Sequence, residues 1–389
     1  MLPIGSFFFG KLEDQYGYRR FIILGSVLHV LSVFLSAWST KIWHFFITQG
    51  LMLGMSNGIL FPILCALPAQ WFRRRKAFAT GIVIAGSSFG GGMNALIIRA
   101  LLSHMSLRGV YLVQSGVEVV ILGISFVLMK EREYPQRAEA EAPFNVEKQQ
   151  ISPDAKIEGS EDVESPSVER VQPEVLPRTK WLNSSLFRDS VFWSLEISLT
   201  IAVFGHLVPF LFLPLFIRSK LPGISSSLCT LPITIANISA FIGRIIVGLT
   251  ADNFGPANTL FISLFISGIT QVIIWNLIGN FGANESSTYG MIMFFAILYG
   301  FWGGCFVSLL TPVGAQLFGS DQPANLSGLL VISGFPGYFA GPTLAGTILS
   351  CSNQNWHIVS LYAGGVQICG AVIFLWARFK RMPRIFVRF

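Results

Sequence analysis

The sequence predicts an all-α membrane protein whose helices form two bundles, and three observations indicate this fold. Hydrophobic residues make up 52% of the 389 residues, whereas charged residues make up only 12%. Soluble domains carry about 25% charged residues, so this chain lacks the polar side chains that a water-facing surface needs. Long apolar runs recur along the chain, and one polar pattern occurs twice, 238 residues apart.

Each apolar run of about 20 residues predicts one helix that crosses the membrane. Residues 1–9 resemble the end of a further helix, so we predict ten full helices and a partial N-terminal one, and we expect the first helix of the bundle to be missing. The predicted spans are residues 21–39, 43–70, 77–101, 109–129, 191–217, 225–250, 258–279, 288–314, 325–350 and 356–377.

A hydrophilic segment separates the two predicted bundles. It is rich in Glu, Pro, Ser and Gln, and its residues 131–180 carry 12 acidic and 7 basic side chains. Such a composition buries too little apolar surface to fold and predicts a disordered cytoplasmic linker. The predicted organisation is an incomplete N-terminal bundle (1–130), the linker (131–188), a C-terminal bundle (189–378) and a cytoplasmic tail (379–389).

Lysine and arginine lie mostly on one side of the predicted spans. If residues 11–20 face the cytoplasm, 14 basic residues fall inside and 5 outside, which is the bias expected of cytoplasmic loops. We therefore predict a multi-pass protein, of the plasma membrane, with a cytoplasmic C-terminus. Asn284 begins an Asn-Glu-Ser sequence on the outer side and is a candidate glycosylation site.

The repeated pattern is Gly-x-x-x-Asp-x-x-Gly, which reads GKLEDQYG in the first copy and GLTADNFG in the second. The glycines permit a tight turn, and the carboxylate suits the positive end of a neighbouring helix dipole. A simple capped turn is the alternative, but two copies at matching positions favour a contact that closes the cytoplasmic side. The candidate gating residues are Gly10, Asp14, Gly17, Arg19, Arg20, Arg74, Arg75, Gly248, Asp252 and Gly255.

The duplication extends beyond these two turns. At an offset of 246 residues, Gly54, Gly58 and Gln70 align with Gly300, Gly304 and Gln316. Membrane proteins built from duplicated halves are typically secondary transporters. The sequence therefore predicts a transporter that exposes a small solute to each side of the membrane in turn.

The two turns resemble the signatures of the major facilitator superfamily. The stretch from Trp71 to Gly81, WFRRRKAFATG, is similar to a signature of its monocarboxylate transporter family, especially of the fungal members. The resemblance implies a two-bundle transporter of a monocarboxylate or related organic anion, with proton symport. Ala240 departs from the pattern, because animal members carry Asp there.

Arg244 is the leading candidate for solute binding, because a cation inside a membrane helix usually faces a partner or a cavity. Its guanidinium also suits carboxylate recognition, although the side chain could instead reach the membrane edge. The resemblance implies that helices 4, 7, 8 and 10 line a central cavity. Further candidates for solute binding are Asn57, Asn94, His206, Asn237 and Trp302, each of which could equally bond a neighbouring helix.

Glu118 and His206 are candidate proton carriers, since ionisable groups inside membrane helices are costly and often functional. Glu196 lies about two turns from the predicted cytoplasmic end, and we expect it at the membrane interface. No nucleotide-binding, zinc-protease or serine-hydrolase motif is present, and no Cys-x-x-Cys pair occurs. We therefore predict no enzyme activity, no cofactor, no metal and no nucleic-acid partner; lipid, solute and protons are the expected partners.

Two further functions remain alternatives to organic-anion transport. Fungal relatives of the resembled family are broad in substrate, so the chain could export a secondary metabolite. The absent first helix favours a third hypothesis, in which the chain is a solute sensor or a truncated remnant that does not transport.

Overall fold

The chain folds into helices whose ends coincide with glycines, prolines and polar turns. The computed structural model describes residues 1–72, 74–129, 184–281, 284–319 and 322–381. All the regular structure in these ranges is helical. Ten helices in the described part of the chain are long and apolar enough to cross a membrane. The predicted all-α transmembrane fold is therefore confirmed.

The N-terminal half, residues 1–129, begins with a helix that is shorter than a full span and continues with four longer helical segments. One of these segments contains a π-helical stretch. The elements are α1 (Leu2–Tyr16), α2 (Tyr18–Ser36), α3 (Ile42–Phe45), η1 (Phe46–Met52), α4 (Leu53–Trp71), α5 (Lys76–Leu102) and α6 (Leu107–Leu128).

The C-terminal half, residues 190–381, contains six spans, several of which are interrupted. The predicted span 191–217 breaks at Leu207, where α9 ends and α10 begins with a proline in its first turn. The elements are α9 (Ser190–His206), α10 (Val208–Lys220), α11 (Ser226–Phe254), α12 (Pro256–Ile269), η2 (Thr270–Trp275), α13 (Asn276–Phe281), α14 (Glu285–Gly303), α15 (Phe306–Phe318), α16 (Pro323–Ile332), α17 (Gly334–Cys351) and α18 (Trp356–Arg381).

Two boundaries differ from the sequence prediction. The two signature motifs are not loops, because α1 continues to Tyr16 and α11 to Phe254. Each chain reversal is made by one glycine with a positive φ, Gly17 at 86° and Gly255 at 90°, a conformation that other residues rarely adopt. The predicted linker lies mostly outside the described residues, and its end contains the short helix α8 (Ser184–Phe187).

Apolar side chains fill the space between the helices and also lie on their outer surface. Leu195, Leu260 and Phe374 belong to one buried cluster of the C-terminal half. On α6, by contrast, the apolar residues Val117, Val120 and Ile124 are exposed, as lipid-facing residues are. These exposed apolar residues agree with the hydrophobic composition of the chain.

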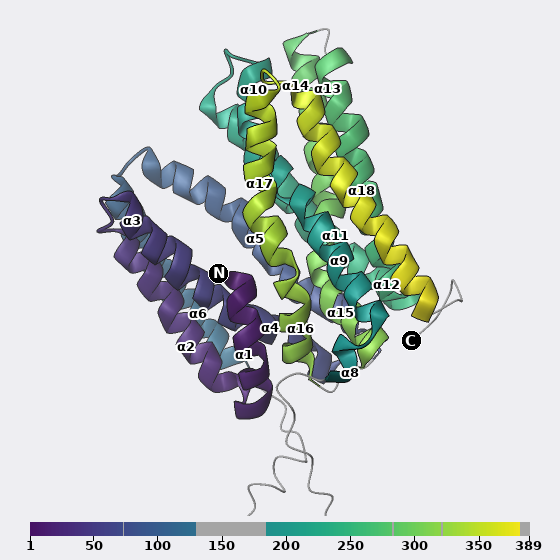
Figure 1. Cartoon of the computed structure of the whole chain (residues 1–389). Coiled ribbons are helices and arrows are strands. Elements are labelled where there is room, and N and C mark those ends of the chain that lie inside the picture. The colour runs from purple at the N-terminus through teal and green to yellow at the C-terminus, as the bar shows by residue number, and fades with distance from the viewer. Residues whose placement is uncertain (73, 130–183, 282–283, 320–321, 382–389) are drawn as a thin grey trace, which may run out of the picture. The chain divides into compact units, whose positions relative to one another are not determined.

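Besides smaller contacts of α4 with α16 and of α5 with α15, the two halves touch along two main helix pairs, α5 with α11 and α1 with α16 (Figure 1). Glycine permits the close approach in both pairs. A Cβ atom on Gly81 would lie 2.6 Å from the carbonyl oxygen of Arg244, and one on Gly328 would lie 2.2 Å from that of Ser6. Both distances are shorter than real Cβ contacts, so each pair depends on its glycine.

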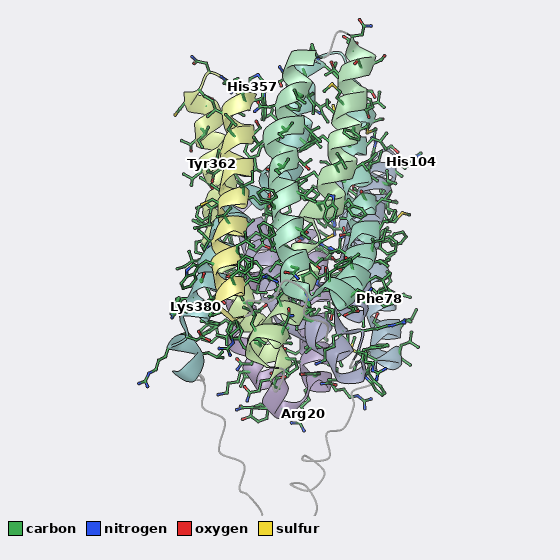
Figure 2. The ribbon with its side chains drawn as sticks, turned by 90° about the vertical axis from the view of Figure 1, so that its right-hand side faces the viewer. Arg20, Phe78, His104, His357, Tyr362 and Lys380 are labelled. Carbon is green, nitrogen blue, oxygen red and sulfur yellow. The ribbon has the colours of Figure 1, made fainter. Side chains whose placement is uncertain are left out.

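One end of the helices carries the residues that the charge distribution assigns to the cytoplasm. Figure 2 shows Arg20, Phe78 and Lys380 toward this end and His357 toward the other. Phe78 contacts Asp252, and Arg20 lies close in sequence to Asp14. Both repeated aspartates therefore lie at the same end of the helices.

Candidate functional site

Asp252 accepts hydrogen bonds from the start of a helix in the other half of the molecule. Its two carboxylate oxygens accept from the backbone N–H groups of Ala77 and Phe78, each at 3.0 Å. These residues open α5, where the first N–H groups have no partner within the helix. The negative charge also lies at the positive end of the helix dipole. We call this arrangement the Asp252 contact.

Asp14 forms the equivalent contact in the opposite direction. Its carboxylate accepts from the backbone N–H groups of Ala324, at 3.4 Å, and Asn325, at 2.8 Å, in the first turn of α16. The hydroxyl of Tyr18 donates a third hydrogen bond to the same carboxylate at 2.6 Å. We call this arrangement the Asp14 contact. Each half thus caps a helix of the other half.

The candidate gating glycines lie at these contacts. A Cβ atom on Gly10 would lie 2.5 Å from the carbonyl oxygen of Ala324, and one on Gly248 would lie 2.8 Å from that of Ala77. The candidate arginines are less closely involved. Arg75 is exposed and interacts electrostatically with Asp252, whereas Arg19 lies over the ring of Phe126, at 5.3 Å. Arg20 and Arg74 are exposed.

Arg244 is buried and bonded to the protein itself. Its Nε donates to the carbonyl oxygen of Gly304 at 3.0 Å. One terminal nitrogen donates to the carbonyl oxygen of Ile84 at 2.6 Å and to the hydroxyl of Ser87 at 2.7 Å. The guanidinium therefore ties α11 to α5 of the other half, and it does not reach the membrane edge.

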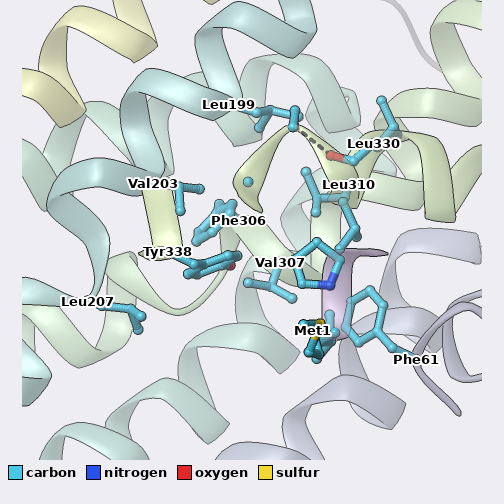
Figure 3. A pocket seen from close by; sticks show the side chains of 15 residues that line it. Met1, Phe61, Leu199, Val203, Leu207, Phe306, Val307, Leu310, Leu330 and Tyr338 are labelled. Carbon is cyan, nitrogen blue, oxygen red and sulfur yellow. Dashed lines mark hydrogen bonds between the residues drawn. The ribbon is translucent and has the colours of Figure 1, made fainter. Parts of the chain in front are cut away.

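An apolar cavity of about 400 Å³ lies among helices from both halves. No side chain that lines it is charged, and Ser333 and Tyr338 are the lining residues that carry a hydroxyl group. Figure 3 shows Tyr338 beside Phe306. The carbonyl oxygen of Ser333 is held by the hydroxyl of Thr200 at 2.8 Å. The lining residues are Met1, Leu2, Pro3, Phe61, Leu199, Val203, Leu207, Phe306, Val307, Leu310, Leu330, Val331, Ser333, Gly334 and Tyr338.

The other candidate solute-binding residues lie outside this lining. The His206 ring packs against Phe306, a lining residue, with ring centroids 4.7 Å apart. Asn237 donates to the carbonyl oxygen of Ile233 on its own helix at 2.9 Å. Trp302 packs against the buried cluster of the C-terminal half. Asn57 and Asn94 are half-buried on α4 and α5.

Glu118 lies in a polar cluster within the N-terminal half. The cluster includes His29, which was not among the predicted site residues. Its carboxylate lies 3.7 Å from Nε2 of His29 and accepts from the Gln114 amide at 3.2 Å. Nδ1 of His29 lies 3.3 Å from the Ser56 hydroxyl, and His29 also bonds Asn57. The sequence could have indicated His29, because it is an ionisable residue in the middle of the predicted span 21–39.

The burial of two further carboxylic acids was not predicted from the sequence. Glu196 was expected at the membrane interface, but it is buried beside Ser333 of the cavity. Glu13 is fully buried although it precedes the gating residue Asp14. In both cases the helix turns the side chain inward, which the sequence position does not reveal.

The remaining predictions concern the surface and metals. Asn284 is exposed and precedes α14, so its glycosylation stays a prediction. Within the described residues, no group of three His, Cys, Asp or Glu side chains is placed to hold a metal ion.

Comparison with known proteins identifies the family. The model of the Major Facilitator Superfamily matches residues 2–275. MFS-type transporter pynF of Aspergillus niger is 25% identical over 99% of this chain and 78% of its own length. Aspyridones efflux protein apdF of Emericella nidulans is 27% identical over 94% and 64%, and riboflavin transporter MCH5 of Saccharomyces cerevisiae is 25% identical over 98% and 68%.

Two solved structures share the fold. The fucose:proton symporter FucP of E. coli is 16% identical and superimposes with a TM-score of 0.65, covering 98% of this chain and 87% of FucP. The proton:xylose symporter XylE is 12% identical, with a TM-score of 0.67 and coverage of 96% and 83%. With ten apolar helices in the described residues and a family model that spans most of its length, the chain belongs to the major facilitator superfamily.

Proposed function

We propose that this protein exports a small, largely apolar organic solute by alternating access. The observation that carries the proposal is the apolar cavity among helices of both halves, combined with two contacts that join the halves at one end. A solute in the cavity reaches one side of the membrane while these contacts are made and the other side after they break. The plasma membrane location and the cytoplasmic C-terminus belong to this proposal.

The Asp14 and Asp252 contacts suit a reversible closure. Each consists of hydrogen bonds from backbone N–H groups to a carboxylate, with no permanent link. A hydrogen bond to a charged group contributes about 1.5–3 kcal/mol. Such contacts stabilise the closed arrangement and still allow it to open on the timescale of transport.

The cavity lining favours a neutral solute over a carboxylate. A carboxylate moved into apolar surroundings loses its hydration and needs a cation or several donors in return. The lining offers two hydroxyl groups and no charged side chain. The names of two relatives, an aspyridones efflux protein and an agnestins efflux protein, support export of an organic metabolite.

Transport of an organic anion is the second candidate, and one observation favours it. Arg244 interacts electrostatically with Tyr338, which lines the cavity. A rearrangement that released its bonds to Ile84 and Ser87 would bring a cation toward the solute. Glu118 with His29, and His206, remain candidate proton carriers for either solute class. The fold is shared with two proton symporters.

A matched pair of ligands tests the solute class. Methyl 2-naphthoate and 2-naphthoate have the same ring system, but only the second is charged. We expect the ester to raise the melting temperature of the purified full chain, because a ligand that binds only the folded state stabilises it. The carboxylate should have a much smaller effect. Equal protection by both compounds would contradict a neutral solute.

A cavity-filling substitution ties this binding to transport. Val307→Phe reduces the cavity, whereas Val117→Phe adds the same bulk on an exposed surface of α6 and serves as the control. We expect cells with the parent or the control to retain less of at least one organic metabolite than cells with Val307→Phe. An untargeted comparison of metabolites inside and outside the cells measures this. Identical profiles would favour the sensor or remnant hypothesis.

A further inference from the structure

Glu13 is a carboxylic acid without a partner in the interior of the molecule. Its side chain is 0% exposed. Within the described residues, neither of its carboxyl oxygens has a hydrogen-bond partner. An ionised carboxylate in such a place would lose its hydration with nothing in return. The arrangement therefore fits only the neutral, protonated acid.

Glu13 lies on the face of α1 that joins the two halves. Residues 6, 10 and 13 follow one another on one side of a helix, at spacings of four and three. The carbonyl oxygen of Ser6 lies against Gly328, and Gly10 lies against Ala324, both on α16 of the other half. Cys65 of α4 interacts electrostatically with Glu13 and lies near Thr311 of the other half. The acid is thus enclosed by the contact between the halves.

Within the described residues, no cation pairs with the Glu13 carboxyl group. Asp14, the next residue, carries a second carboxylate, which adds like-charge repulsion to an ionised Glu13. Among the helices packed against α1, α16 carries no titratable side chain. The titratable groups of α1 and of its other neighbours are Lys11, Asp14 and Tyr16 of α1, Cys65 of α4, Tyr18, Arg19, Arg20 and His29 of α2, and Tyr338 and Cys351 of α17.

The second half of the molecule shows that the fold does not need an acid here. The repeat that aligns Asp14 with Asp252 aligns Glu13 with Ala251. Ala251 is also 0% exposed, and its neighbour Asp252 makes the equivalent helix contact. Because an alanine serves the same position in the second copy, packing alone does not require the carboxyl group of Glu13.

We propose that Glu13 is a proton-binding site that keeps its proton while the α1–α16 contact is closed and releases it when the contact opens to water. One proton moves from water to the carboxylate and later returns to water, and no other bond changes. The proposal rests on the alternating-access cycle proposed above. It makes the closed arrangement favourable at low pH and progressively less favourable as the pH rises, because only the protonated acid fits the closed contact.

Labelling of Cys65 tests the proposal without a solute. Cys65 is fully buried at the contact between the halves, so its reaction with N-ethylmaleimide reports opening. The parent is the full chain in membrane vesicles, with the other four cysteines replaced by serine. Its labelling rate is divided at each pH by that of Glu13→Gln, which mimics the protonated acid. This ratio removes the pH dependence that the thiol shows in both proteins. The Glu13 charge disfavours the Cys65 thiolate, so this direct effect works against the expected rise and cannot imitate it.

We expect the ratio to rise steadily between pH 5 and pH 8.5, by at most about tenfold per pH unit, because a water-exposed Glu ionises near pH 4.3 whereas the closed contact keeps the acid neutral. Glu13→Asp should keep the pH dependence, and Glu13→Ala, which copies Ala251, should remove it even if Glu13→Gln folds poorly. Glu118→Gln, which removes an acid of the N-terminal half that lies away from this contact, should leave it intact.

A ratio that stays flat across this pH range would overturn the proton site, as would loss of the pH dependence in Glu118→Gln alone. A flat ratio together with normal metabolite export would leave the proposed transport standing. A strong pH dependence without metabolite export would support the proton site and contradict the proposed transport.

Discussion

The Asp14 and Asp252 contacts repeat one design in the two halves, and they differ in their surroundings. Asp14 receives two backbone bonds and one from Tyr18, whereas Asp252 receives two backbone bonds and has Arg75 nearby. The parts they share, a carboxylate, a helix start and a close glycine, are what closure requires. The residues that differ, Tyr18 and Arg75, give each contact a different additional partner for its carboxylate.

A second matched pair leads to the same conclusion. Ser6 and Arg244 occupy equivalent positions, and they donate to the equivalent carbonyl oxygens of Gly58 and Gly304. The serine bond stays within its own half, but the longer arginine also reaches Ile84 in the other half. Holding the glycine carbonyl is therefore common to both copies, whereas the cation that joins the halves is particular to the second.

The largest effect is expected from the glycines at the helix crossings. Gly81→Leu and Gly328→Leu would each place a side chain against backbone of the other half. Overpacking of this kind costs about 1–3 kcal/mol or more, so the contact should separate and Cys65 labelling should rise about ten- to a hundredfold.

Gly86→Leu is the matched control for these variants, because nothing lies within 4 Å of a Cβ atom at that position. It should label like the parent. If labelling rises much more in one of the two glycine variants, the two helix crossings do not contribute equally to closure.

Much of the fold was predictable because hydropathy reports which segments enter lipid. The same signal gives no information on the backbone within a span, so the break at Leu207 and the π-helices η1 and η2 were missed. The two aspartates could be selected as gating residues because they repeat. Their partners could not, since Asp252 and Ala77 are 175 residues apart and meet only in the folded chain.

The residues that line the cavity could not be predicted from the sequence for a related reason. Its Leu, Val and Phe residues do not differ in sequence from those that face lipid, so only the packing of the halves distinguishes them. Glu13 was overlooked because Asp14 beside it dominated the motif. The direction of its side chain depends on the continuation of α1 to Tyr16.

Neutralising either aspartate should raise Cys65 labelling less than the glycine variants do. The size of each increase shows which of the two contacts contributes more to closure. Asp14→Asn and Asp252→Asn remove a negative charge from a helix start, which contributes about 0.3–1 kcal/mol and up to about 2 kcal/mol where partly buried. Cys65 labelling at constant pH should rise several-fold in each variant, and more for Asp14→Asn because its carboxylate holds three donors.

Tyr18→Phe removes the third of these donors alone and separates its contribution from that of the charge. It should account for the difference between the two asparagine variants. The double aspartate variant should show roughly the product of the single effects, since distant sites usually add in free energy. A double variant no more open than one single variant would indicate that the two contacts close as one unit.

The smallest effect is expected from Arg75, which distinguishes the Asp252 contact from the Asp14 contact. Arg75 is exposed, and exposed ion pairs contribute about 0.2–1 kcal/mol. Arg75→Gln should raise Cys65 labelling about twofold in dilute buffer, and the increase should vanish in 1 M salt, where charges are screened beyond about 3 Å. Arg74→Gln, its exposed neighbour, should change neither value. An effect of Arg75→Gln that persisted at high salt would mean that the arginine stabilises the helix start by packing rather than by its charge.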